Sequence, residues 1–165
     1  MTYAYKTMIS PVGTLKLISS DKGLVGILWE NDSPDRTPFK LMTEDKNNPF
    51  LVEAEQQLRD YFSGKLKQFS LQLDFIGTQF QKKVWEALLT IPFGETRSYA
   101  QIAKQIGNPK AVRAVGAANG KNPLSIIAPC HRVIGANGKL TGFAGGLETK
   151  AFLLKIENPQ RAFAA

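Results

Sequence analysis

The stretch Ile126-Ile127-Ala128-Pro129-Cys130-His131-Arg132-Val133 holds the only cysteine and the only histidine of a 165-residue chain, side by side. A single cysteine cannot form an internal disulfide, and one Cys with one His is too few ligands for a protein zinc site. The thiol is therefore either a small buried hydrophobe or a reactive group. Because the residues after it are polar and basic, and such surroundings stabilise a thiolate, we favour the reactive group.

Positive charge is concentrated in the part of the chain that contains this cysteine. Residues 1–74 carry nine Lys or Arg against ten Asp or Glu, whereas residues 75–165 carry twelve against four. No acidic residue occurs between Glu95 and Glu148. A basic tract of this kind attracts polyanions, and salt weakens the attraction. A solvated basic face without a partner is the alternative, and the position of Cys130 inside the tract argues against it.

Residues 1–74 predict an α+β support module without chemistry of its own. The expected elements are, in order, strands at Thr14–Ser20 and Leu24–Glu30 joined by a turn at Gly23, a loop at 31–48, a helix begun by Asn48 and Pro49 and ended by Gly64, and a strand at Gln68–Phe75.

Residues 75–165 predict mainly helices. Two capping boxes, Thr78 with Gln81 and Ser98 with Gln101, each mark the start of one helix. A capping box satisfies two free backbone donors at once, so it is a specific signal for a helix start.

A third helix is expected from Asn108 and Pro109 to about Asn119, directly after a glycine, Gly107, that ends the second. Two helices joined at a glycine are typical of a helix-turn-helix, and a purely structural helix pair is the alternative. Because the pair lies inside the acid-free basic tract, we expect it to contact DNA.

The third helix lacks the cluster of Asn, Gln and Arg that reads base edges in the major groove. Its small residues instead favour close contact with backbone and sugars in the minor groove, largely independent of sequence. Arg113 is the long side chain near its middle and is placed to fill the gap left by an extruded base. Tight helix packing is the alternative explanation for the alanines.

Several motifs in the same order and spacing resemble the methylated-DNA–protein-cysteine methyltransferases, the O6-alkylguanine-DNA alkyltransferases. The motifs are Arg113-Ala114-Val115-Gly116, Asn122-Pro123, the Cys130 stretch, Gly145-Gly146-Leu147 and Leu153-Leu154-Lys155-Ile156-Glu157. The resemblance implies an N-terminal ribonuclease H-like α/β module, here residues 1–74. It also implies a mostly helical domain, here residues 75–165, with a winged helix-turn-helix-like DNA-binding motif.

The resemblance also implies an irreversible, single-turnover transfer of the alkyl group from a flipped O6-alkylguanine to Cys130. His131 would act as the base through a water, because side chains adjacent on extended backbone point apart. Glu157 would orient the imidazole, Asn122 would brace the active-site turn, and Tyr99 would donate to the purine ring.

Other site residues follow from the same resemblance. The expected substrate pocket consists of Val133, Phe143, Ala144, Gly145 and Gly120, and the expected DNA contacts are Arg113, Asn108, Lys110, Ala111, Lys121 and Ala136. Phe143 and Ala144 stand where relatives can have Tyr and Ser. Because Gly120 and Ala144 are small, we expect room for alkyl groups larger than methyl, and O4-alkylthymine is a further candidate substrate.

We expect no cofactor, because the alkyl group stays on sulfur, and no metal, because the cysteines of relatives with structural zinc are absent. No apolar run near twenty residues and no signal-peptide pattern occurs, so we expect a soluble, cytoplasmic protein that binds no membrane. We also expect a monomer that binds double-stranded DNA. Two other readings stay open. A lesion sensor without transfer would have tryptophan at position 130, and a Cys-His hydrolase would turn over without needing the basic helices.

Overall fold

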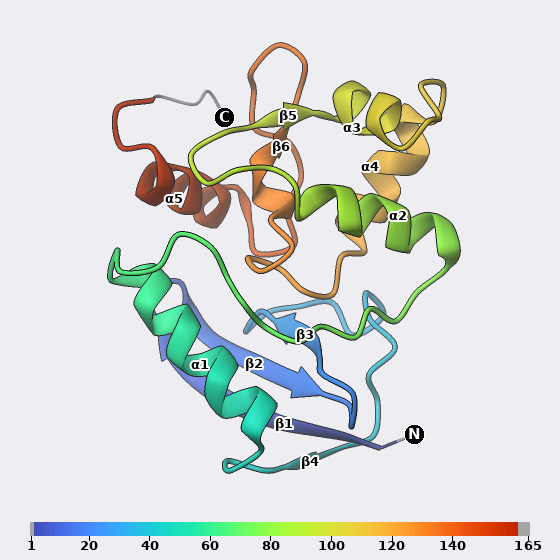
Figure 1. The fold of residues 1–165 in the computed structure, drawn as a ribbon. Coiled ribbons are helices and arrows are strands. Elements are labelled where there is room, and N and C mark those ends of the chain that lie inside the picture. Colours follow the sequence, from blue (N-terminus) through green and yellow to red (C-terminus); the bar gives the residue numbers. More distant parts are fainter. Residues whose placement is uncertain (1, 162–165) are drawn as a thin grey trace. The chain divides into compact units, whose positions relative to one another are not determined.

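The computed structural model describes residues 2–161. The chain divides into two compact units, residues 1–76 and residues 77–165. Figure 1 shows a sheet with one helix in the first unit and a mainly helical second unit, which is the two-domain mixture of helix and sheet expected from the sequence. None of the helices in the described part of the chain has the length and apolar character needed to span a bilayer.

The first unit is built on a four-stranded sheet with the order β3-β2-β1-β4. The predicted hairpin is confirmed, because β2 (Gly13–Ser19) and β3 (Leu24–Leu28) pair antiparallel. The sheet also contains β1 (Tyr3–Ser10), antiparallel to β2, and β4 (Met42–Glu44), parallel to β1. β4 lies within the segment predicted as a loop, and its three residues are too few to produce a recognisable alternation.

Helix α1 (Pro49–Phe62) packs across this sheet (Figure 1). As predicted, Asn48 caps it: the side-chain oxygen accepts hydrogen bonds from the backbone N–H groups of Phe50 and Leu51. The buried side chains of α1 are Leu51, Ala54, Gln57, Leu58 and Tyr61. Their spacing of three and four residues gives the helix one buried face, which holds it on the sheet.

The strand predicted at Gln68–Phe75 is wrong except at one position, where Leu73 bridges to Leu24 of β3. The Gln57 side chain of α1 binds this segment instead: it accepts from the Ser70 N–H at 2.9 Å and donates to the Ser70 hydroxyl at 3.2 Å. A side chain that takes up backbone groups in this way competes with a strand ladder. The segment is therefore irregular and is bonded to α1 through Gln57.

Three helices form the frame of the second unit: α2 (Gln79–Leu88), α3 (Tyr99–Gln105) and α4 (Val112–Gly120). Both predicted capping boxes are confirmed, at the starts of α2 and α3. The buried Trp85 of α2 donates its indole N–H to the carbonyl of Ala118 on α4 at 2.8 Å. This bond satisfies the one polar group of a large apolar side chain and joins the two helices.

The predicted start of the third helix is wrong by three residues. Gly107 does end α3, with a φ of +81°, but α4 begins only at Val112 and has no side-chain cap. The Ala111 N–H donates to the carbonyl of Asn108 at 3.0 Å, so residues 108–111 form a tight turn. An Asn-Pro pair begins a turn as readily as a helix, and here the turn forms.

The quoted Cys-His stretch lies between α4 and the last helix, α5 (Leu147–Glu157). It contains a 3₁₀ turn, η1 (Cys130–Arg132), followed by β6 (Val133–Ile134). β6 pairs in parallel with β5 (Arg97–Ser98), and residues 135–139 after it form a turn. That turn is closed by the Gly135 N–H, which donates to the Lys139 carbonyl at 2.9 Å.

Candidate active site

Cys130 lies at the first position of η1 and is 4% exposed. The backbone here is a 3₁₀ turn, so the expectation of extended backbone at Cys130 and His131 is wrong. Because a 3₁₀ helix has about three residues per turn, neighbouring side chains on it still point in different directions. The thiol and the imidazole therefore face different parts of the interior, although their residues are adjacent.

Asn122 braces the turn that leads to Cys130. Its side-chain amide donates to the Ala128 carbonyl at 2.8 Å, and its side-chain oxygen accepts from the Leu124 N–H at 3.0 Å. Between these contacts Ile126 has a φ of +75°, which a β-branched residue adopts only when its surroundings enforce it. Asn122 is fully buried and supplies this enforcement, so it holds a strained turn just before the cysteine.

His131 meets Glu157, the carboxylate that the family resemblance pairs with it. Its Nε2 lies 2.8 Å from Glu157 Oε2, and its ring is fully buried. The Nδ1 atom is buried and has no hydrogen-bond partner among the described residues. Glu157 is 7% exposed, so this carboxylate at the end of α5 is buried and not solvated.

Arg132 forms a buried ion pair with the same carboxylate. Its Nε donates to Glu157 Oε1 at 2.8 Å and one terminal nitrogen donates to Oε2 at 3.0 Å. The other terminal nitrogen donates to the Ile91 carbonyl at 2.6 Å. One buried carboxylate thus receives an imidazole and a guanidinium, which satisfies both of its oxygens.

The charges of this cluster follow from burial and from these partners. Burial acts to raise the pKa of Glu157, but His131 and Arg132 outweigh it and lower that pKa to about 2. Burial lowers the pKa of His131, and Arg132 and Lys150 act in the same direction while Glu157 opposes them. At neutral pH Glu157 is therefore ionised and the imidazole is neutral.

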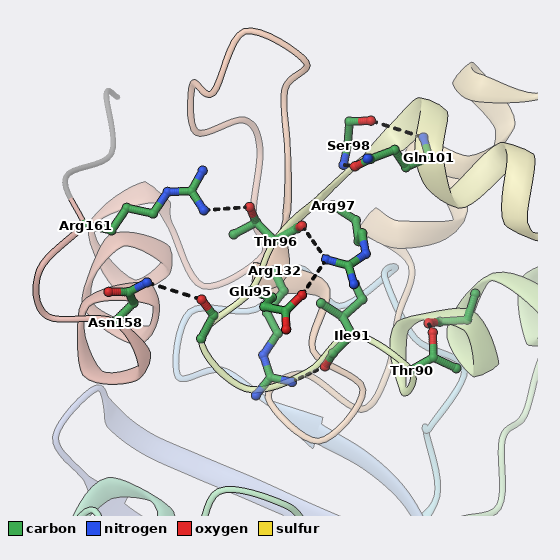
Figure 2. A network of polar contacts seen from close by, with 12 residues as sticks. Thr90, Ile91, Glu95, Thr96, Arg97, Ser98, Gln101, Arg132, Asn158 and Arg161 are labelled. Atoms are coloured by element: carbon green, nitrogen blue, oxygen red, sulfur yellow. Dashed lines mark hydrogen bonds and ion pairs between the residues drawn. The ribbon is translucent and has the colours of Figure 1, made fainter.

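Figure 2 shows how the segment between α2 and β5 is fastened near this cluster. Arg132 donates to Ile91 at one end of it, and Asn158, just after α5, donates to the Gly94 carbonyl at 3.3 Å. Arg161 donates to the Thr96 hydroxyl at 3.1 Å. These bonds join the approach to Tyr99 to the helix that carries Glu157.

Tyr99 lies at the start of α3 and its hydroxyl is 2.6 Å from the hydroxyl of Thr141. Thr141 begins the pocket loop, residues 141–146, which carries the expected pocket residues Phe143, Ala144 and Gly145. In this loop the Gly146 N–H donates to the Phe143 carbonyl at 2.9 Å. Ala144 at the loop surface is exposed, whereas Phe143 and Gly145 are half-buried. The structure thus brings Tyr99 to this loop, a contact that sequence reasoning did not predict.

Lys150 is the residue of this site that sequence reasoning missed. It lies on α5, is fully buried, and donates from Nζ to the carbonyls of Val133 at 2.7 Å and Thr141 at 3.1 Å. A signal was present, because Lys150 shares a helical stripe with Leu153, Leu154 and Glu157, the buried residues of α5. A lysine inside an apolar stripe points to a buried cation.

The expected pocket residues Val133 and Gly120 lie in different surroundings. Val133 is buried, its N–H donates to the Cys130 carbonyl, and its own carbonyl accepts from Lys150. Gly120 is exposed at the end of α4, and an added Cβ would meet no atom within 4 Å.

The expected DNA-contacting residues are all at the surface. Arg113 on α4 is exposed, as are its neighbours Ala114 and Ala117, whereas Val115 and Ala118 face the interior. The remaining expected contacts are placed as follows: Asn108, Lys110 and half-buried Ala111 in the turn before α4, Lys121 directly after it, and Ala136 in the turn after β6. The exposed face of α4 is therefore made of small side chains around one arginine.

Within residues 2–161 no group of three or more His, Cys, Asp or Glu side chains is placed to hold a metal ion. The polar groups described at the site are one thiol, one imidazole, one carboxylate, one phenol and two cations.

Fold and site together define a class: a two-unit protein whose helical unit carries a buried Cys-His-Arg turn joined to a carboxylate on the following helix. Residues 79–159 match the DNA-binding domain of 6-O-methylguanine DNA methyltransferase, and residues 3–75 match its ribonuclease-like domain. The chain belongs to the methylated-DNA–protein-cysteine methyltransferase family.

Individual relatives agree with this assignment. The methylated-DNA–protein-cysteine methyltransferase of Methanosarcina acetivorans is 51% identical over 154 residues, which cover 93% of this chain and 97% of that protein. The protein of that name from Mycobacterium tuberculosis H37Rv is 51% identical over 93% of this chain and 91% of its own. The crystal structure of Mycobacterium tuberculosis OGT in complex with DNA has a TM-score of 0.85 at 48% identity, covering 96% of this chain and 94% of that chain.

Proposed function

We propose that this protein repairs O6-alkylguanine in DNA by moving the alkyl group irreversibly onto the sulfur of Cys130. The observation that carries the proposal is the polar chain beside this cysteine. It consists of a fully buried His131 bonded through Nε2 to Glu157, with Nδ1 buried and without a partner among the described residues. Membership of the family, whose members are named for transfer to a protein cysteine, supports the proposal.

The charge state of the cluster gives the direction of proton transfer. Ionised Glu157 only accepts, so Nε2 of the neutral imidazole carries the hydrogen and Nδ1 keeps a lone pair. Nδ1 takes the proton of Cys130 through one water, and the positive charge that forms on the ring is stabilised by Glu157. His131 is thus the base, and Glu157 orients it.

The transfer itself is a displacement at saturated carbon. The thiolate forms a bond to the alkyl carbon, the bond from that carbon to O6 breaks, and the electron pair stays on guanine. Tyr99 donates its hydroxyl proton to the purine ring, and the imidazolium restores that proton, so the net movement is from thiol to guanine. No tetrahedral oxyanion forms. The thioether has no route back to a thiol, so each molecule acts once.

DNA is bound, in this proposal, through the minor groove and largely independently of sequence, with the target base flipped out. The small exposed residues Ala114, Ala117 and Gly120 let α4 approach the sugar-phosphate backbone closely. Arg113 fills the space left by the base, which repays part of the cost of unstacking. The crystal structure of the Mycobacterium tuberculosis relative in complex with DNA supports DNA as the partner.

Groups larger than methyl are also accepted in this proposal, and O4-alkylthymine is a second substrate. The expected pocket position Ala144 is small and exposed at the surface of its loop, which leaves room for a longer alkyl group. Comparable transfer from O6-methylguanine and O6-benzylguanine would support a roomy pocket, and a complete failure of benzyl transfer would contradict it. An oligonucleotide with O4-methylthymine tests the second substrate in the same assay.

Residues 1–74 act in this proposal as a support module, and one chain suffices for the reaction. The sole cysteine, which is the nucleophile of this proposal, lies in the second unit. Light scattering of the protein during transfer tests whether a monomer is the active form.

The decisive experiment incubates the protein with an oligonucleotide that carries a radiolabelled O6-methylguanine. We expect up to one label per molecule, covalently attached to Cys130, and none in Cys130→Ala. Binding without label would support a sensor, and several lesions cleared per molecule would support a turnover enzyme; either result would refute the suicide transfer.

A further inference from the structure

We propose that Lys150 is a positioning residue of the alkyl-transfer site: it clamps the pocket loop to the strand after Cys130 and supplies the buried positive charge that balances the thiolate. This inference rests on the proposed function, in which Cys130 reacts as a thiolate.

The clamp is defined by two hydrogen bonds from one ammonium group. Nζ of Lys150 donates to the carbonyl of Val133 at 2.7 Å and to that of Thr141 at 3.1 Å. Val133 directly follows the 3₁₀ turn of the nucleophile, and Thr141 begins the pocket loop. The hydroxyl of Thr141 in turn lies 2.6 Å from that of Tyr99. One lysine therefore links the nucleophile, the loop and the tyrosine.

The charge of Lys150 is the second observation. The side chain is fully buried, and both of its hydrogen bonds among the described residues go to neutral carbonyls. Burial lowers its pKa to about 8, while the negative charge of Cys130 acts to raise it. A buried cation is costly unless an anion lies nearby. Helix α5 packs against η1, and Val133, which Lys150 binds, closes the turn of Cys130, so we assign the anion to the Cys130 thiolate.

The other charged groups around Lys150 do not replace this pairing. From η1, His131 is neutral and Arg132 is bonded to Glu157. On α5 itself, Glu157 is bonded to His131 and Arg132, and Glu148 and Lys155 are exposed. Tyr99 reaches Lys150 only through Thr141. Lys150 therefore favours the thiolate directly, and this effect adds to proton removal by His131.

Alkylation of the thiol by iodoacetamide across pH 5 to 10 tests this effect without DNA. The full chain has one cysteine, so the rate reports Cys130 alone. In Lys150→Met and Lys150→Gln we expect the pH of half-maximal rate to rise by about one unit, with a roughly tenfold lower rate near neutral pH. Lys150→Gln keeps a hydrogen-bond donor for the two carbonyls, so it tests the effect of the charge separately from that of the hydrogen bonds.

Lys150→Arg, which keeps the charge, and Lys155→Met, which removes an exposed charge from the same helix, should leave this pH unchanged. Circular dichroism checks that each variant is folded. Coincident pH–rate profiles for wild type, Lys150→Met and Lys150→Gln would overturn the proposal, because a merely structural lysine changes the maximum rate of alkylation and not its pH dependence. Failure of alkyl transfer from DNA with shifted profiles would instead count against the proposed function alone.

The wild-type protein gives a readout that needs no variant. Reaction with iodoacetamide converts the thiolate into a neutral thioether, so the anion that faces Lys150 disappears. We expect an NMR titration of the Lys150 ammonium to move to lower pH after the reaction. An identical titration before and after the reaction would overturn the pairing of Lys150 with Cys130.

Discussion

His131 and Glu157 are 26 residues apart in the sequence, and their side chains meet at 2.8 Å in the interior of the second unit. The same carboxylate receives the guanidinium of Arg132, the next residue of the turn. A single helix end thus orients the imidazole beside the cysteine and neutralises a buried cation. Removing this carboxylate is therefore the most direct test of how the site works.

Glu157→Gln should slow alkyl transfer about 10- to 100-fold, because the amide keeps the shape but no longer stabilises the imidazolium. Single-turnover rates with an O6-methylguanine duplex measure the effect. Glu148→Gln is the matched control, since Glu148 lies exposed on the same helix, and it should react at the wild-type rate. Equal rates for the two variants would exclude Glu157 from the proton path.

Acid should destabilise the protein through the same carboxylate. Its pKa is lowered from 4.5 to about 2 in the folded state, so its stabilisation is complete above pH 4.5 and is lost as pH falls toward 2. A shift of this size corresponds to about 3 kcal/mol. The lowered pKa of His131 acts in the same direction, below its ordinary value of 6.5.

Urea unfolding at a series of pH values measures this loss. Wild type should lose unfolding free energy between pH 4.5 and 2, and Glu157→Gln should show a flatter profile over that interval. Parallel profiles for the two proteins would mean that Glu157 is not held ionised by its partners.

Asn122→Ala should lower the free energy of unfolding by about 2 to 4 kcal/mol, because it removes two buried hydrogen bonds and leaves their partners unsatisfied. It should also slow transfer, since nothing then holds Ile126 in its strained conformation before Cys130. Asn108→Ala, at an exposed position whose side chain makes no hydrogen bond among the described residues, serves as the stability control. An unchanged midpoint in denaturant for Asn122→Ala would contradict the bracing role.

Tyr99→Phe should slow transfer about 10-fold or more by removing the donor to the leaving guanine. Thr141→Val removes the partner of that hydroxyl and leaves the phenol in place, so transfer should be much less affected. Rapid-quench measurements on both variants compare the two effects. If Thr141→Val were the slower variant, the hydroxyl of Tyr99 would matter for the loop and not for the purine.

Arg113→Ala should impair transfer from duplex DNA far more than transfer from free O6-benzylguanine, because only the duplex requires a base to be replaced in the stack. It should also weaken duplex binding and reduce the salt dependence of that binding by about the amount that one phosphate contact contributes. Lys155→Ala removes an exposed charge from α5 and should leave the salt dependence unchanged. Equal losses with duplex and free base would argue against a role in base flipping.

Local signals in the sequence were enough for much of the helical frame. The capping boxes at Thr78 and Ser98 and the cap at Asn48 form as predicted, because each depends only on residues within one helical turn. Uniqueness of Cys130 and the absence of acidic residues around it are likewise properties of the chain itself. These features identify the Cys130 segment as the candidate site from the sequence alone.

Only the tertiary structure decided which charged groups are buried near the thiol and which predicted elements do not form. Lys150 and Glu157 are ordinary charged residues in the sequence. Burial on one face of α5 makes Lys150 a cation without a carboxylate partner, and Glu157 stays an ionised acid with a pKa of about 2. The irregular path of residues 68–75 has the same origin, because Gln57 of α1 takes up the Ser70 N–H. Contacts between distant segments decide which charges meet and which backbone groups pair, and the periodicity of one segment does not identify its partner.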